Sequence, residues 1–262
     1  PSTIDKEEKQ GVDAVLLAIP FGALSNVEAV YSAVRVEGAA GIAPMNERET
    51  RRRFGARVRT NFREWDVALV AGRFDGADVG GGSLSGHVGG VGLHGEAAYA
   101  HNGIVRSQVI WGRLSTADAR KPTFTGPWSR FVRGDFCRFT AGADYGFAWR
   151  NVTVGGEFYH DGSGSSEIRY YDWIGLTLGN RLSLARHYLA GSVRGLLTPL
   201  LTLSFTTIVN LDEPAALFQP QVAYSVSDNA EVTVGAQVHN GGDRSEYAGV
   251  NRLLYMVLAW YF

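Results

Sequence analysis

The stretch "NVTVGGEFYH", residues 151–160, decides the fold because its side chains alternate in character with a period of two. Val152 and Phe158 fall on one face, whereas Thr153 and Glu157 fall on the other. Successive side chains of a strand point to opposite sides of a sheet, whereas a helix repeats about every 3.6 residues. We therefore predict a β-strand here.

The same alternation recurs along the chain, for example in "LTLSFTTIVNL" (201–211) and "EVTVGAQVH" (231–239). One face is apolar, and the other is small or polar. We predict an all-β chain with strands at 11–19, 26–36, 50–60, 64–73, 80–87, 91–101, 134–146, 151–161, 186–196, 200–211, 215–226, 230–240 and 251–262. Longer connections are expected at 37–49, 102–133, 162–184 and 241–250. Short turns at one end and long loops at the other are typical of outer-membrane barrels.

Composition narrows the class of protein. The chain has 262 residues, of which 33 are glycine and 19% are charged, with a net charge of -1. Its single cysteine, Cys137, cannot form an internal disulfide. The absence of a net basic charge weighs against a nucleic-acid partner. No apolar run reaches the roughly 18 residues that a transmembrane helix needs.

The polar face separates a barrel from a soluble sandwich, which alternates in the same way. A sandwich turns Lys and Glu toward bulk water, whereas the polar face here carries Gly, Ser, Thr and mixed charges, as in a wide barrel lumen. We therefore predict one antiparallel transmembrane β-barrel domain over 1–262. The predicted pore-lining residues are Arg53, Arg57, Arg59, Asp66, His94, Glu96, Arg138, Asp144, Glu157, Glu231 and Gln237.

Aromatic residues collect near the predicted strand ends. Trp and Tyr are enriched at the two interfaces of a bilayer, although aromatic residues also favour strands in general. The predicted interface aromatics are Trp65, Tyr99, Tyr145, Trp149, Tyr224 and Trp260, with Tyr261 beside the last.

The last ten residues, "LLYMVLAWYF", place Leu254, Met256, Leu258, Trp260 and Phe262 on one face. This pattern resembles the C-terminal signal of Gram-negative outer-membrane β-barrel proteins, which the barrel-assembly machinery reads. Residues 186–238 also resemble the repeated hairpins of porin-like bacterial proteins. The resemblance implies an outer-membrane location, contact with lipid and lipopolysaccharide, and no cofactor. It implies a fold and no particular solute.

The number of predicted strands is odd, whereas bacterial single-chain barrels have an even number. In porin-like chains, a segment that resembles residues 1–17 follows earlier strands. We therefore expect this sequence to lack N-terminal strands of a barrel with about 14 to 16 strands in total. A miscounted strand at 80–87 is the alternative.

Three motifs suggest chemistry that we do not expect. "GVGLHG" (90–95) has glycine spacing typical of dinucleotide binding, but it continues into a predicted strand rather than a helix. "YHDGSGSS" (159–166) holds His160, Asp161 and Ser163, yet neighbouring loop residues rarely form a hydrolase triad. We expect a polar extracellular turn instead. A metal site is not expected either, because His94, His239, Glu96 and Glu231 have no ligand spacing.

Two further segments bear on transport. In "RETRRRFGARVR" (48–59), alternation sends Arg53, Arg57 and Arg59 to the pore wall, whereas Arg51 and Arg52 would lie at the outer rim near lipopolysaccharide phosphates. The long segment 102–133 would either fold inward to narrow the channel or bind a partner through its apolar residues, Ile104, Val109, Ile110 and Trp111.

The sequence thus predicts an outer-membrane, porin-like channel for passive diffusion of small hydrophilic solutes or ions. The alternative is a structural barrel that anchors or houses a partner protein or an exported polymer. We expect no enzymatic activity, cofactor or metal, and either a homo-oligomer or an envelope protein as partner.

Overall fold

The computed structural model describes residues 13–36, 49–110, 114–115, 123–124, 128–177, 181–242, 245–247 and 251–261. Thirteen strands form one antiparallel sheet in chain order. They are β1 (Ala14–Pro20), β2 (Asn26–Val36), β3 (Glu49–Phe62), β4 (Trp65–Phe74), β5 (Ala77–Val88), β6 (Val91–Ile110), β9 (Trp128–Phe147), β10 (Val152–Asp161), β11 (His187–Thr198), β12 (Leu201–Asn210), β13 (Ala215–Ser227), β14 (Ala230–Asn240) and β15 (Leu253–Trp260). The short strands β7 (Leu114–Ser115) and β8 (Thr123–Phe124) pair with each other.

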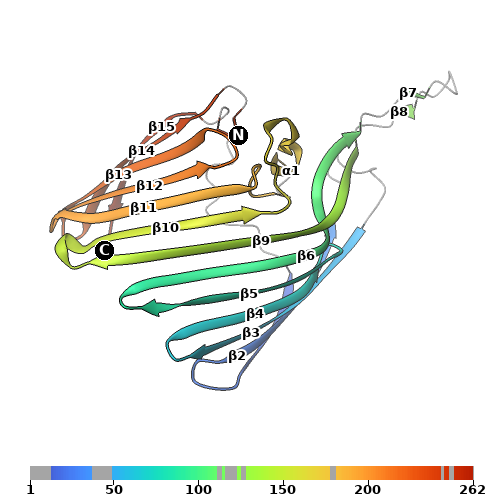
Figure 1. The fold of residues 1–262 in the computed structure, drawn as a ribbon, viewed down its shortest axis with the longest axis horizontal. Coiled ribbons are helices and arrows are strands. Elements are labelled where there is room, and N and C mark those ends of the chain that lie inside the picture. The colour runs from blue at the N-terminus through green and yellow to red at the C-terminus, as the bar shows by residue number, and fades with distance from the viewer. Residues whose placement is uncertain are drawn as a thin grey trace.

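The sheet curls into an open trough with tight turns between consecutive strands at one end (Figure 1). Three of these turns have residues in the left-handed region: Arg63 and Glu64 between β3 and β4, Gly89 and Gly90 between β5 and β6, and Arg150 and Asn151 between β9 and β10. The other end carries the longer connections and the only α-helix of the described residues, α1 (Trp173–Thr177). The 3-10 helices η2 (Trp149–Asn151) and η3 (Ile168–Tyr170) lie at opposite ends of β10. The all-β antiparallel fold is therefore confirmed.

The doubtful strand is real. β5 pairs with β4 from Ala77 to Ser85 and with β6 from Asp78 to Val88, without a break in register. A miscount at 80–87 is therefore excluded as the source of the odd number.

The segment 102–133 differs from its prediction as a loop. β6 and β9 have 20 residues each, and their pairing continues to Ile110 and Trp128. A membrane-spanning strand needs about 9 to 11 residues, so this hairpin rises well beyond its neighbours (Figure 1). The described residues of β6 and β9 in this segment do not fold inward (Figure 1). Irregular register between Ala100 and Gly103, and again between Ile104 and Arg106, marks the base of the projection.

Pairing register sorts the side chains onto two faces. On one face apolar residues stand opposite each other from strand to strand, as in the row Tyr31, Phe54 and the row Val58, Leu69. Many of these apolar side chains are exposed. A soluble protein rarely exposes so large an apolar surface to water. This apolar face is convex, and the polar face is concave.

No helix in the described part of the chain is long and apolar enough to cross a membrane.

The two edge strands, β1 and β15, run in the same direction because eleven strands of alternating direction lie between them. They do not pair with each other within the described ranges. That further strands complete the barrel stays a prediction.

Candidate functional site

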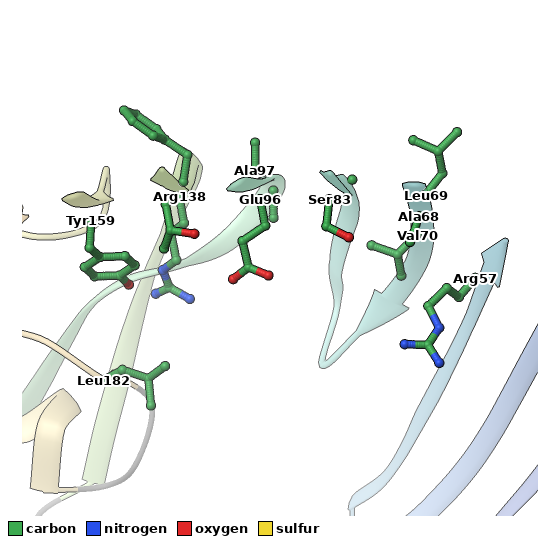
Figure 2. A pocket seen from close by; sticks show the side chains of 14 residues that line it. Arg57, Ala68, Leu69, Val70, Ser83, Glu96, Ala97, Arg138, Tyr159 and Leu182 are labelled. Atoms are coloured by element: carbon green, nitrogen blue, oxygen red, sulfur yellow. The ribbon is translucent and has the colours of Figure 1, made fainter. Parts of the chain in front are cut away.

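The concave face is the candidate site. Arg57, Glu96 and Arg138 point into a hollow on this side, whereas Leu69 and Ala97 point the opposite way (Figure 2). The pairing register places all the predicted pore-lining residues on this face: Arg53, Arg57, Arg59, Asp66, His94, Glu96, Arg138, Asp144, Glu157, Glu231 and Gln237. That they line a water-filled pore stays a prediction.

A row of arginines follows β3. Arg57 contacts Glu28 of β2 through Nε and Nη2, the shorter bond being 2.7 Å. Arg53 binds both carboxylate oxygens of Asp75, in the turn after β4, at 2.9 Å each. Such two-point contacts hold a guanidinium in a fixed orientation. Two of the three predicted arginines are therefore held by acids beside them.

An acidic cluster lies on β6, β9 and β10. The ring of His94 contacts Glu157 at 3.2 Å through Nε2 and Asp144 at 3.9 Å through Nδ1. The ring lies over Gly142, where any Cβ would overlap it. All three side chains remain accessible to solvent. Positive charge thus prevails on β3 and negative charge on β6 to β10.

The inner face of β11 to β13 is mostly uncharged. Among the described residues of these strands, Arg194 is the charged exception on this face. The polar side chains are otherwise hydroxyls and amides, namely Ser192, Thr202, Ser204, Thr206, Gln219, Gln221 and Ser225. The concave face therefore has a charged wall and a neutral wall.

No cluster of three metal-ligating side chains occurs among the residues that the structure describes. His94 and Glu96 lie on β6, whereas Glu231 and His239 lie on β14, six places along the sheet. The four residues are not brought together.

Residues 162–177 and 181–186, called the inward segment below, fold onto the concave face at the loop end. At their start, Asp161 is fully buried and contacts Arg138 at 3.0 Å. Its Oδ1 accepts bonds from the Ser163 hydroxyl at 2.6 Å and backbone N–H at 2.9 Å, and its Oδ2 accepts from Ser183 at 3.2 Å. A buried carboxylate is stable only with such partners.

A second set of bonds ties the segment to the base of the β6–β9 hairpin. Asp172 accepts a 2.7 Å bond from the backbone N–H of Ser107. The buried guanidinium of Arg181 lies 3.9 Å from Asp172 and donates to the carbonyl oxygen of Val105 at 3.2 Å. These contacts span up to 76 residues of sequence.

A third set closes the far side of the segment. The Tyr188 hydroxyl donates to the Glu246 carboxylate at 2.7 Å. The Asn210 amide donates to Tyr171, Glu213 and Glu246 at 3.1 to 3.2 Å, and the backbone N–H of Glu246 donates to Glu213 at 2.8 Å. Two acids thus share one buried amide.

Burial is the main cause of the pKa shift of Glu246. Loss of solvent raises the pKa of this carboxyl above its ordinary value, and bonds from Tyr188, Leu184 and Asn210 only partly offset that effect. Asp212 shows the opposite balance. Burial alone would raise its pKa, but bonds from the His187 ring and from the backbone of Arg186 and His187 lower it.

An apolar cluster completes the inward segment. Leu184 and Ala185 are fully buried and pack with Tyr171 and Tyr188, against which Tyr159, Leu176 and Ile208 are also packed. Leu182 behaves differently. Its side chain is 84% exposed and borders the hollow from the side opposite the strands (Figure 2).

The predicted interface aromatics fall at the two ends of the sheet. Trp65, Tyr145, Tyr224 and Trp260 lie near the turn end on the convex face, with Trp149 in η2 beside them. Tyr99 lies toward the other end, where its hydroxyl donates to Asp135 at 2.8 Å. Contact of these rings with lipid headgroups stays a prediction.

The predicted assembly signal lies on the last strand. Leu254, Leu258 and Trp260 are strongly exposed on the convex face of β15. Phe262 lies outside the described residues. Recognition of this strand by the assembly machinery stays a prediction, as do contacts with lipopolysaccharide and an oligomeric or envelope partner.

Sequence reasoning missed the inward segment. The stretch 159–166 was expected to be an exposed polar turn, but Asp161 and Ser163 are buried. Glu213, Arg181 and Asp172 were not singled out, although each is buried and charged. The only local signal was the concentration of polar residues directly after a strand.

No protein-family model matches the chain, and no curated protein matches it in sequence. Solved structures that resemble it include two of OmpT, an outer-membrane protein of Vibrio cholerae. The outer-membrane expressed form has a TM-score of 0.46 and 8% identity, and the match covers 92% of this chain and 77% of that one. The in-vitro folded form has a TM-score of 0.44 and 8% identity, covering 95% and 88%.

The likeness concerns the fold and no particular residue. A convex apolar face on an antiparallel sheet is what an outer-membrane β-barrel presents to lipid, and the bacterial outer-membrane location stays a prediction.

The prediction that the chain is not an enzyme needs correction. It followed only from interpreting the barrel as a passive channel. One fold carries proteins of different activities, so the exclusion of an enzyme is withdrawn.

Proposed function

We propose that this barrel is a channel for passive diffusion of small hydrophilic solutes or ions across the outer membrane. The observation that carries the proposal is the concave face, which presents charges of both signs opposite an apolar convex face. A polar interior is what a water-filled barrel needs, because lipid can solvate only the other side.

The width of the sheet supports a water-filled interior. At a spacing of about 4.8 Å between neighbouring strands, thirteen strands form a wall that measures roughly 60 Å around the barrel. A barrel of eight strands measures roughly 40 Å around, and its own side chains fill the interior. The interior of this barrel is therefore too wide for its own wall side chains to close.

Planar-bilayer recording of the refolded protein tests the proposal. We expect stepwise conductance, and Glu96→Gln should shift the reversal potential under a salt gradient toward anions because a lumen carboxylate is lost. The matched control is Ala97→Ser, one residue along on the convex face, which should leave the reversal potential unchanged. A folded barrel that never conducts contradicts the proposal.

The β6–β9 hairpin favours a second candidate, a barrel that anchors a partner. Its projection beyond the wall offers a surface that a simple channel does not need. Purification in mild detergent distinguishes the two. A stoichiometric second subunit that is lost when residues 105–132 are replaced by a short turn supports anchoring, whereas conduction by the protein alone supports the channel.

A further inference from the structure

The hollow on the concave face has two chemically different sides. Its volume is about 450 Å³, within the range of roughly 300 to 1,000 Å³ typical of small-molecule sites. The strands contribute the polar residues Arg57, Ser83, Glu96 and Arg138 among apolar ones such as Val70, and the inward segment contributes Leu182 (Figure 2). A wall that carries separate charged groups therefore faces an apolar tip.

Leu182 is unusual in its location. It is the most exposed large apolar side chain of the described residues, at 84%. The next most exposed, Leu254 and Met256, lie on the convex face where lipid would cover them. Leu182 instead borders the hollow, whose wall carries charged side chains. Exposure of a leucine to water there is unfavourable. An apolar group of a solute would remove that exposure.

One carboxylate in the lining of the hollow, that of Glu96, has no charged partner among the described residues. Glu28 offsets Arg57, and Asp161 offsets Arg138. Within the described ranges, Glu96 has neither a hydrogen bond nor an ion pair, and the Nη1 atoms of Arg57 and Arg138 donate to no protein group. The hollow thus offers an acceptor for a cation and, on either side of it, N–H donors for an anion.

We infer that this hollow binds small zwitterions that carry an apolar substituent, such as amino acids with an aliphatic side chain. The ammonium group would contact Glu96, the carboxylate would contact Arg57 or Arg138, and the apolar group would cover Leu182. The inference rests on the proposed channel function and names the solute class that the channel retains. Binding should be weak, on the order of millimolar, because a channel must release what it admits.

Block of single-channel current by L-leucine tests the inference. We expect leucine to interrupt the current at a concentration about fivefold lower than that required for glycine, leucine amide or 4-methylpentanoate. These three probes lack the apolar group, the carboxylate and the ammonium group respectively. Equal block by leucine amide would reduce the hollow to a cation site and overturn the inference, and equal block by 4-methylpentanoate would reduce it to an anion site.

Two variants locate the binding. Glu96→Gln and Leu182→Ser should each raise the half-blocking leucine concentration about fivefold while the solute-free channel still opens. The matched control is Glu231→Gln, the same change on the concave face of β14, which should not alter the block. Unchanged block in both test variants would overturn the inference.

Calorimetry separates this inference from the channel proposal. If the refolded protein never conducts, the channel proposal fails. Titration of leucine into the same protein in micelles then still decides the inference, because heat of binding with an affinity about fivefold weaker in Glu96→Gln supports it and the absence of heat overturns it.

Discussion

Two segments at the loop end of the barrel behave in opposite ways. The inward segment turns inward and packs on the concave face, whereas β6 and β9 continue their pairing outward (Figure 1). The sequence predicted a polar extracellular turn over 159–166, and either an inward fold or a surface for a partner over 102–133. The difference lies in their partners. Asp161, Asp172 and Arg181 contact partners on β6 and β9, whereas Gln108 to Ile110 of β6 simply pair with Trp128 to Arg130 of β9.

The comparison teaches that length and apolar content do not decide which loop enters a barrel. A charged group can be buried only where an opposite charge or hydrogen-bonding groups are in place to pair with it. The wall supplies these partners at Arg138 and at the backbone of Ser107. The entering segment is therefore the one whose charges match the wall.

The largest effect should come from Asp161→Ala. The change leaves Arg138 without its buried carboxylate partner and the hydroxyls of Ser163 and Ser183 without their acceptor, and it should destabilise the inward segment by about 3 kcal/mol. Protease cleavage between residues 162 and 186 should become fast, and the single-channel conductance should rise. The contrasting change is Asp135→Ala at the base of the hairpin, which affects an exposed carboxylate. Equal sensitivity of the two segments would remove the distinction between them.

A smaller effect is expected for Gly164→Ala. A Cβ at this position would overlap the backbone of Ala185, so the inward segment would have to shift. Overpacking of this kind costs about 1 to 3 kcal/mol. Gly80→Ala is the matched control, because a Cβ there meets open space. Urea unfolding in detergent measures both, and a shift for Gly80→Ala as large as for Gly164→Ala would contradict the packing described.

The pH dependence should be smaller still and specific to the inward segment. Because burial raises the pKa of Glu246 in the folded protein, the unfolded chain loses this proton first as the pH rises. The network around Tyr188 is therefore most stable below the ordinary pKa of Glu and weakens as the pH rises through the raised value. The protection factor of the Leu184 N–H, which donates to Glu246, measures this change. Glu246→Gln should abolish the dependence, and its persistence would assign it to another group.

The smallest effect should follow removal of the projecting strand ends. Replacing residues 108–130 by a short turn cuts pairing that lies beyond the contacts with the inward segment. The bonds of Val105 and Ser107 to that segment are kept. We therefore expect little change in conductance or in the unfolding midpoint of the wall. Loss of the folded barrel would show instead that the hairpin supports the whole sheet.

Most of the wall could be predicted from the sequence because alternation is local. Each of the thirteen predicted strands overlaps a strand of the sheet, and the Phe158 and Glu157 faces fall as expected. Beyond His101, the period-two pattern fails because irregular register at Gly103 and Arg106 shifts successive side chains. The continuation of β6 was therefore hidden.

The inward segment could not be predicted because its contacts are long-range. Asp172 and Ser107 are 65 residues apart, and Tyr188 and Glu246 are 58 apart. Nothing near Asp172 in the sequence indicates that a backbone N–H awaits it. Polar residues in a loop are ordinarily solvated, so the expectation for 159–166 followed a general tendency that the wall overrides.

The separation of charge across the trough has a consequence for motion as well as for affinity. Arginines on β3 and acids on β6 to β10 create a lateral electric field, while β11 to β13 add little to it. A molecule with a permanent dipole would be rotated as it enters, with its positive end toward β6. An elongated solute would then pass through the channel with its dipole held across the channel axis. Its dimensions perpendicular to the dipole would therefore influence its rate of permeation.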